Sequence, residues 1–102
     1  MCGLVGILSV GGPANLTCIS AMTDEIVSRG PDDQGHWEDE TAGIALGHRR
    51  LSVVDLSSAG HQPMLSVSGR FAMAFNGEIY NHRELRKQTP NYSYQTGSDC
   101  EV

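Results

Sequence analysis

The segment over residues 3–10 constrains the fold of this chain more than any other part of its sequence. It is rich in leucine, valine and isoleucine, and the turn sequence Gly11-Gly12-Pro13 follows it. A short apolar run bounded by turn residues is typical of a buried strand. Only Met1 and Cys2 precede the run, so the sequence predicts a strand that begins at the N-terminus of the chain.

The rest of the chain alternates between helical and strand patterns. Apolar residues recur every three or four positions from Asn15, which predicts a helix that Gly30-Pro31 ends just after Arg29. Cys18 is interpreted as a small buried residue of this helix. Shorter patterns predict further strands at 36–38, 44–48, 71–75, 78–80 and 92–94, and a second helix at 84–87.

The last residues carry a helix-start pattern. Ser98 is followed three positions later by Glu101, which is the spacing of a capping box. A helix is therefore predicted to begin where the sequence stops. The simplest interpretation is that the chain is a piece of a longer protein, and a disordered tail is the alternative.

Composition excludes several classes of protein. A length of 102 residues fits one small domain. The net charge of -5 argues against nucleic acid or an anionic membrane as the main partner. No apolar run approaches the roughly 20 residues of a membrane span, and no basic segment precedes the first apolar run, so no signal peptide is indicated. A cytoplasmic location is expected.

The cysteines argue against a disulfide framework or a metal site. Cys2, Cys18 and Cys100 are an odd number, and no two of them have the close spacing of a zinc-ligand pair. A thiol-redox or metal-binding protein is therefore a disfavoured alternative. Cys2 differs from the other two, because removal of Met1 would leave its thiol and a free α-amine on one residue. An N-terminal amine can activate its own side-chain nucleophile.

Asn76-Gly77 supports two interpretations. Asn-Gly after an alternating strand is the strongest short signal for a β-hairpin with a type I′ turn. Alternatively, the Asn76 side-chain amide and a nearby backbone N–H form an oxyanion hole, in which each donor stabilises a tetrahedral intermediate by about 3 kcal/mol.

Arg50 and Asp99 each allow two interpretations as well. Arg50 is either a surface residue with its stem on apolar neighbours or a guanidinium that grips a carboxylate. Asp99 either favours a helix start by its charge or holds a substrate ammonium. Together they would suit a free α-amino acid. The histidines His48, His61 and His82 are interpreted as structural, although a Cys–His dyad stays open.

Six segments resemble the class II glutamine amidotransferases, the N-terminal-nucleophile group. The resemblance spans nearly the whole chain and is closest to the glutamine-hydrolysing asparagine synthetase branch. The segments are 1–6 (MCGLVG), 29–32 (RGPD), 47–55 (GHRRLSVVD), 60–64 (GHQPM), 75–81 (FNGEIYN) and 97–102 (GSDCEV).

The resemblance implies a role for each matching residue. Cys2 is the nucleophile, its α-amine is the general base, and Asn76 and Gly77 supply the oxyanion hole. The RGPD loop is mainly architectural. The residues implied in glutamine binding are Arg50 for the α-carboxylate, Glu78 and Asp99 for the α-ammonium, and Leu51, Ser52, Val53 and Val54 as the pocket wall.

The resemblance also implies an α+β fold, the four-layer α/β/β/α sandwich of N-terminal-nucleophile hydrolases, of which residues 1–102 are about the first half. The implied reaction releases ammonia and glutamate through a thioester. Ammonia then passes to the protein's own C-terminal synthetase domain, which uses ATP and magnesium and lies outside this chain. No cofactor or metal is expected in the chain itself, and a homodimer is left open. The alternatives are an amidotransferase for another carboxylate acceptor, as in polysaccharide or natural-product pathways, and a catalytically silent domain on the same scaffold.

Overall fold

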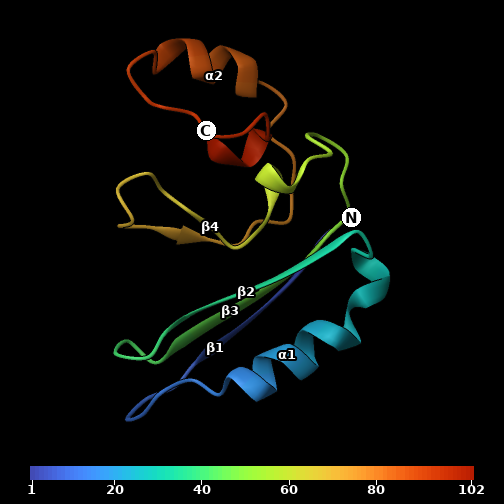
Figure 1. Cartoon of the computed structure of the whole chain (residues 1–102), viewed down its shortest axis with the longest axis vertical. Helices are drawn as coiled ribbons and strands as arrows, with labels where there is room; N and C mark the ends of the chain where they lie inside the picture. The colour runs from blue at the N-terminus through green and yellow to red at the C-terminus, as the bar shows by residue number, and fades with distance from the viewer.

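A three-stranded antiparallel sheet organises the N-terminal half of the chain. The computed structural model describes residues 1–102. Strand β1 (Gly3–Leu8) and strand β2 (Asp33–Asp39) both pair with the central strand β3 (Ile44–Arg50), which gives the order β1-β3-β2. Figure 1 shows the three strands side by side with α1 running along them. The mixture of helix and sheet confirms the expected α+β class.

Helix α1 (Leu16–Glu25) covers one face of this sheet. Asn15 caps it by accepting a hydrogen bond from the N–H of Cys18. A short 3₁₀ helix, η1 (Val27–Arg29), continues it, and Gly30 ends the helical segment as predicted. Ile19 is fully buried against Ala14 and Ala45, and Val5 and Ile7 of β1 pack around them.

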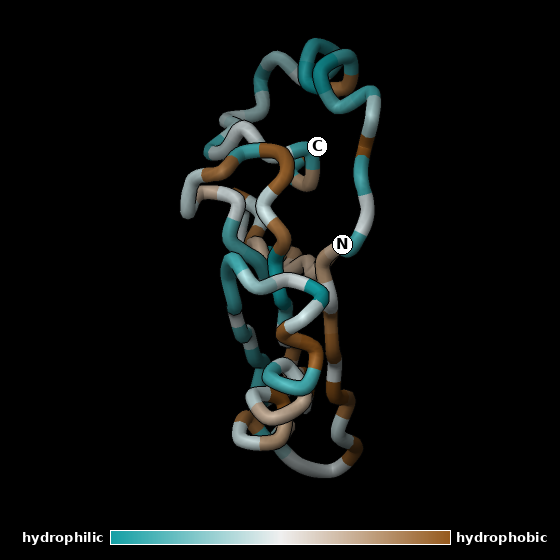
Figure 2. The backbone as a smooth tube through the Cα atoms, turned by 90° about the vertical axis from the view of Figure 1, so that its right-hand side faces the viewer, coloured by the Kyte–Doolittle hydropathy of each residue, from teal (hydrophilic) through white to brown (hydrophobic).

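The C-terminal half carries shorter elements above the sheet. These are η2 (Ser58–Gly60), β4 (Met64–Leu65), β5 (Ala72–Met73), α2 (His82–Gln88) and η3 (Asp99–Glu101). Strands β4 and β5 form a separate two-stranded hairpin. Figure 2 shows that the end of the molecule formed by α2 is mostly hydrophilic, and the molecule is elongated, 42 × 30 × 18 Å. Neither α1 nor α2 has the length and apolar character required to cross a membrane.

Several predicted strands differ from the structure. Strand β2 begins at Asp33, earlier than predicted, because its pairing with β3 extends to the Asp33–Arg50 pair. The predicted strand 71–75 is reduced to Ala72–Met73, and residues 78–80 and 92–94 form no strand. The backbone N–H of Ile79 donates to the Asp99 carboxylate instead of to a neighbouring strand.

The burial pattern of α1 also corrects the sequence prediction. Cys18 is exposed, so its interpretation as a buried residue is wrong. Leu16 and Met22 of the apolar stripe are exposed as well. Ile19 and Thr23, four residues apart, form the buried line instead, because positions i and i+4 share one face of a helix.

Candidate active site

One pocket gathers nearly all of the predicted site residues. It has a volume of about 470 Å³ and lies where the N-terminal end of β1, the chain after β3, the segment after β5 and η3 meet. Ser52 is the one predicted residue that does not line it. The lining residues are Met1, Cys2, Arg50, Leu51, Val53, Val54, Gln62, Phe75, Asn76, Gly77, Glu78, Tyr80, Ser98, Asp99 and Cys100.

Cys2 is held at the rim of the sheet. Its neighbour Gly3 pairs with Arg49 at the start of β1, and the Arg29 Nε–H donates to the Cys2 carbonyl oxygen at 3.1 Å. The Leu51 N–H donates to Cys2 Sγ at 3.4 Å, so the chain after β3 contacts the thiol directly. Met1 is 77% exposed, so the peptide bond that joins it to Cys2 is open to processing.

The RGPD loop, residues 29–32, contacts the end of β3 and holds the chain around Cys2 in place. Asp32 accepts a hydrogen bond from the Ser52 N–H at 2.8 Å, and its own N–H donates to the Arg50 carbonyl oxygen at 3.1 Å. A Cβ atom on Gly30 would lie 2.6 Å from the Arg49 carbonyl oxygen, so only glycine permits this backbone contact. With its bond to Cys2, Arg29 makes the loop a direct support of the cysteine.

Arg50 is buried, which excludes its interpretation as a surface residue. Its guanidinium donates to the carbonyl oxygens of Ser57 at 2.9 Å and Val54 at 3.1 Å, and also to that of Asp55. Three of its five N–H groups are thus used by the chain, and two stay free for a ligand. Gly60 has no side chain at the point where the guanidinium passes. Arg50 therefore shapes the 54–57 loop and also faces the pocket.

The segment that carries Asn76, Gly77 and Glu78 lies open at the pocket. All three residues are exposed, and they belong to no helix or strand. No strand follows Gly77, so the β-hairpin interpretation is wrong. Neither Asn76 nor Gly77 forms a hydrogen bond within the chain, so their donors are available to a ligand.

Asp99 is buried at the start of η3 with its carboxylate aimed at the same segment. It is 5% exposed, and its Oδ2 accepts the Ile79 N–H at 2.7 Å. Ser98 caps η3 as predicted, because its side chain accepts the Cys100 N–H. Glu101 does not complete the capping box and binds the Gln95 and Thr96 backbone N–H groups instead.

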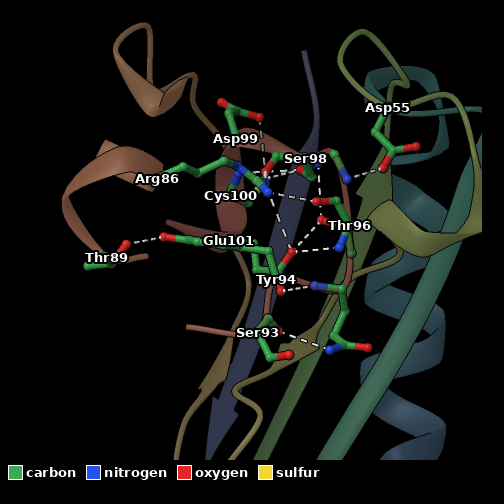
Figure 3. A network of polar contacts seen from close by, with 12 residues as sticks. Asp55, Arg86, Thr89, Ser93, Tyr94, Thr96, Ser98, Asp99, Cys100 and Glu101 are labelled. Carbon is green, nitrogen blue, oxygen red and sulfur yellow. Dashed lines mark hydrogen bonds and ion pairs between the residues drawn. The ribbon is translucent and has the colours of Figure 1, made fainter. Parts of the chain in front are cut away.

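A polar network fixes the chain that leads into η3. Figure 3 shows Arg86 of α2 reaching the carbonyl oxygens of Thr96 at 2.9 Å and Ser98 at 2.6 Å. Glu101 lies 4.0 Å from the Arg86 guanidinium and binds the Thr96 hydroxyl. On the other side, Asp55 accepts the Gly97 N–H, and its bonds from Ser57 lower the pKa of the Asp55 carboxyl. Sequence reasoning assigned no role to Arg86.

Sequence reasoning also missed several lining residues. Gln62 lies within the quoted GHQPM segment, and Phe75, Tyr80, Ser98 and Cys100 lie within the other quoted segments, so membership in a motif was the available signal.

Burial raises the pKa of the Cys100 thiol, so this thiol stays protonated at neutral pH. No group of three or more His, Cys, Asp or Glu side chains is placed to hold a metal ion.

The histidines serve the framework of the site. His48 is 1% exposed, and its Nε2 lies 3.0 Å from the Phe75 carbonyl oxygen. His61 pairs with Asp33 through Nδ1 at 2.7 Å, and His82 lies 3.0 Å from the Ile79 carbonyl oxygen. Burial lowers the pKa of His48, and Arg50 and His61 add to this, whereas the Phe75 bond and Asp33 oppose it.

The lowered pKa of His48 predicts loss of stability in mild acid. The unfolded chain binds a proton at His48 near pH 6.5, whereas the folded chain binds it only at lower pH. The free energy of unfolding should therefore fall as the pH drops below about 6.5. In His48→Gln, whose amide can still donate to Phe75 but does not titrate, urea midpoints should depend less on pH between about 5 and 7. An equal pH dependence in both proteins would contradict this assignment.

The whole chain, residues 1–102, matches the family profile described as a glutamine amidotransferase domain. The chain belongs to this family, which confirms the expectation from its motifs. Among curated relatives, asparagine synthetase [glutamine-hydrolyzing] 2 of Bacillus subtilis (strain 168) is 42% identical over 106 residues, covering all of this chain and 14% of the relative. The asparagine synthetases of Triphysaria versicolor (41%) and Arabidopsis thaliana (38%) also cover the whole chain, which spans 17% of each.

Proposed function

We propose that this chain carries the glutaminase half-reaction of an asparagine synthetase-like amidotransferase. The observation that carries the proposal is the convergence of Cys2, Arg50, Asn76, Gly77 and Asp99 on one pocket from distant parts of the sequence. A thiol, a pair of open donors, a guanidinium and a buried carboxylate are the groups that an amide-bearing α-amino acid requires.

The substrate is glutamine, bound with its two ends at different parts of the pocket. The free N–H groups of Arg50 receive the α-carboxylate. Asp99 and the exposed Glu78 receive the α-ammonium, because a carboxylate that already accepts one N–H has lone pairs left for further donors. Leu51, Val53 and Val54 line the pocket wall. The side-chain amide then reaches Cys2.

The chemistry begins after removal of Met1. The α-amine of Cys2 takes the thiol proton, directly or through one water. The thiolate attacks the amide carbon, and Asn76 and Gly77 donate to the oxyanion that develops. The intermediate collapses as the amine returns the proton to the leaving nitrogen, so ammonia departs and a glutamyl thioester remains. Water then hydrolyses the thioester to glutamate and regenerates the thiol.

The relatives' names place glutamine hydrolysis within asparagine synthetases, and their additional length supports a second activity elsewhere in the protein. We propose that ammonia from this site serves a synthetase domain outside residues 1–102 that uses ATP and magnesium. Aspartate is the acceptor that we infer, because the relatives are named for the synthesis of asparagine, the amide of aspartate. Another carboxylate acceptor is the alternative, and the sequence of that synthetase domain distinguishes the two.

The test is an intact-mass measurement on the full-length protein that carries this chain. It is exposed to a diazoketone analogue of glutamine, which alkylates a nucleophile placed at the amide position. The expected result is loss of Met1 and one adduct per chain, absent from Cys2→Ala. Free glutamine should slow the labelling. Retained Met1 without an adduct would contradict the mechanism and favour a silent domain.

A further inference from the structure

The buried side chain of Gln62 links two segments of the pocket. It is 3% exposed, and both ends of its amide are used. Oε1 accepts the Phe75 N–H at 2.6 Å, and Nε2 donates to Cys100 Sγ at 3.4 Å. A buried amide with two partners in different segments fixes the distance between them.

The link continues through Asp99 to form a closed ring. The Cys100 thiol donates to Asp99 Oδ1 at 3.7 Å, and Asp99 Oδ2 accepts the Ile79 N–H at 2.7 Å. The chain between Phe75 and Ile79 completes the circuit. Both ends of this short segment are thus tied to the same 3₁₀ helix, Phe75 through Gln62 and Cys100, and Ile79 directly through Asp99.

The ring encloses the residues proposed to stabilise the oxyanion. Asn76 and Gly77 lie between Phe75 and Ile79 and form no hydrogen bond within the chain. Their orientation therefore depends on the two anchors on either side. An exposed segment without its own hydrogen bonds holds preorganised donors only if its ends are fixed.

His48 supports the first anchor from the central strand. The Phe75 carbonyl oxygen can only accept, so the His48 Nε2 at 3.0 Å from it carries the proton. This carbonyl belongs to the same peptide unit as the N–H of Asn76. Two buried side chains, Gln62 and His48, thus hold the successive peptide planes that lead into the oxyanion donors.

We propose that Gln62 is a positioning residue that closes this ring and couples the Asn76-Gly77 donors to the Asp99 carboxylate. The inference rests on the proposed glutaminase function, since it assigns Gln62 a role in that site. Gln62 itself acts through Phe75 and Cys100. Loss of its two hydrogen bonds should loosen both anchors of the segment, including Ile79, which Gln62 does not contact.

Hydrogen exchange tests the ring without relying on activity. In the full-length protein, Gln62→Met removes both hydrogen bonds while keeping a side chain of similar length. The Phe75 amide should exchange faster, and the Ile79 amide should also exchange at least about fivefold faster. His61→Ala, a change in the same loop outside the ring, should leave Ile79 protected. Unchanged Ile79 exchange in Gln62→Met would overturn the coupling.

Kinetics then separate positioning from a structural role. In Gln62→Met, kcat for glutamine hydrolysis should fall about tenfold or more, because oxyanion donors act in the transition state. KM should change less than kcat. The His61→Ala protein should retain the kcat of the unaltered protein. Wild-type kcat in a folded Gln62→Met protein would overturn the proposal.

A second variant covers the case in which Gln62→Met does not fold. Cys100→Ala opens the ring at its other side and leaves Gln62 bound to Phe75, so Ile79 exchange should rise while Phe75 stays protected. Unchanged Ile79 exchange in that variant would also overturn the proposal. Failure of the unaltered protein to hydrolyse glutamine would instead reject the proposed function, and the exchange measurements would still decide whether the ring exists.

Discussion

Replacement of Cys2 by alanine is expected to lower kcat/KM for glutamine hydrolysis by about 10⁴-fold or more. The Cys2 thiol lines the same pocket as the open Asn76-Gly77 segment and accepts the Leu51 N–H, whereas the other thiol of the pocket, Cys100, is bound to the side chains of Gln62 and Ser98. Alanine removes the attacking atom and leaves the backbone contacts of residue 2 in place, including the Arg29 bond to its carbonyl oxygen. Steady-state release of glutamate from the full-length protein measures the effect.

The chain contains a matched control for this variant. Cys18 lies exposed on α1 and does not line the pocket, so Cys18→Ala should hydrolyse glutamine at the wild-type rate. The two variants should unfold at similar temperatures, since neither thiol is fully buried. Glutamate release by purified Cys2→Ala at a rate near that of Cys18→Ala would refute Cys2 as the nucleophile.

The sequence predicted the sheet better than it predicted the upper half of the molecule. Strand β1 and the stop of the first helical segment at Gly30 were predicted because an apolar run and Gly-Pro act locally. The segment 78–80 was predicted as a short strand but pairs with no other strand. Its hydrogen-bond partner is the Asp99 carboxylate, a contact over 20 positions that no local pattern encodes.

In the site, too, residues within local motifs were predicted, whereas contacts between distant segments were not. The motifs identified most of the residues that line the pocket, because those residues lie within the motifs themselves. Sequence reasoning left Arg50 ambiguous, since only the fold shows that its guanidinium is buried and bound to the carbonyl oxygens of the 54–57 loop. Gln62 and His48 were missed as supports for Phe75, because their role depends on which buried polar groups meet in space.

Asp99→Asn is expected to lower kcat/KM for glutamine by about 10- to 100-fold, chiefly through KM. Asparagine keeps one oxygen that can accept the Ile79 N–H, so the fold of the segment should survive while the negative charge is lost. Asp99 is buried and Glu78 is exposed, so the interaction of Asp99 with an ammonium is screened less by water. Glu78→Gln should therefore have a smaller effect than Asp99→Asn.

A substrate that lacks the α-ammonium shows whether Asp99→Asn lowers kcat/KM through lost charge or through altered geometry of the segment. Glutaric acid monoamide has the carboxylate and the side-chain amide of glutamine but no amino group. If Asp99 binds the ammonium, Asp99→Asn should lower kcat/KM for glutamine and leave the small value for the monoamide nearly unchanged. An equal loss on both substrates would mean that Asp99 acts only by holding the Ile79 N–H, and ammonium recognition would then have to come from Glu78.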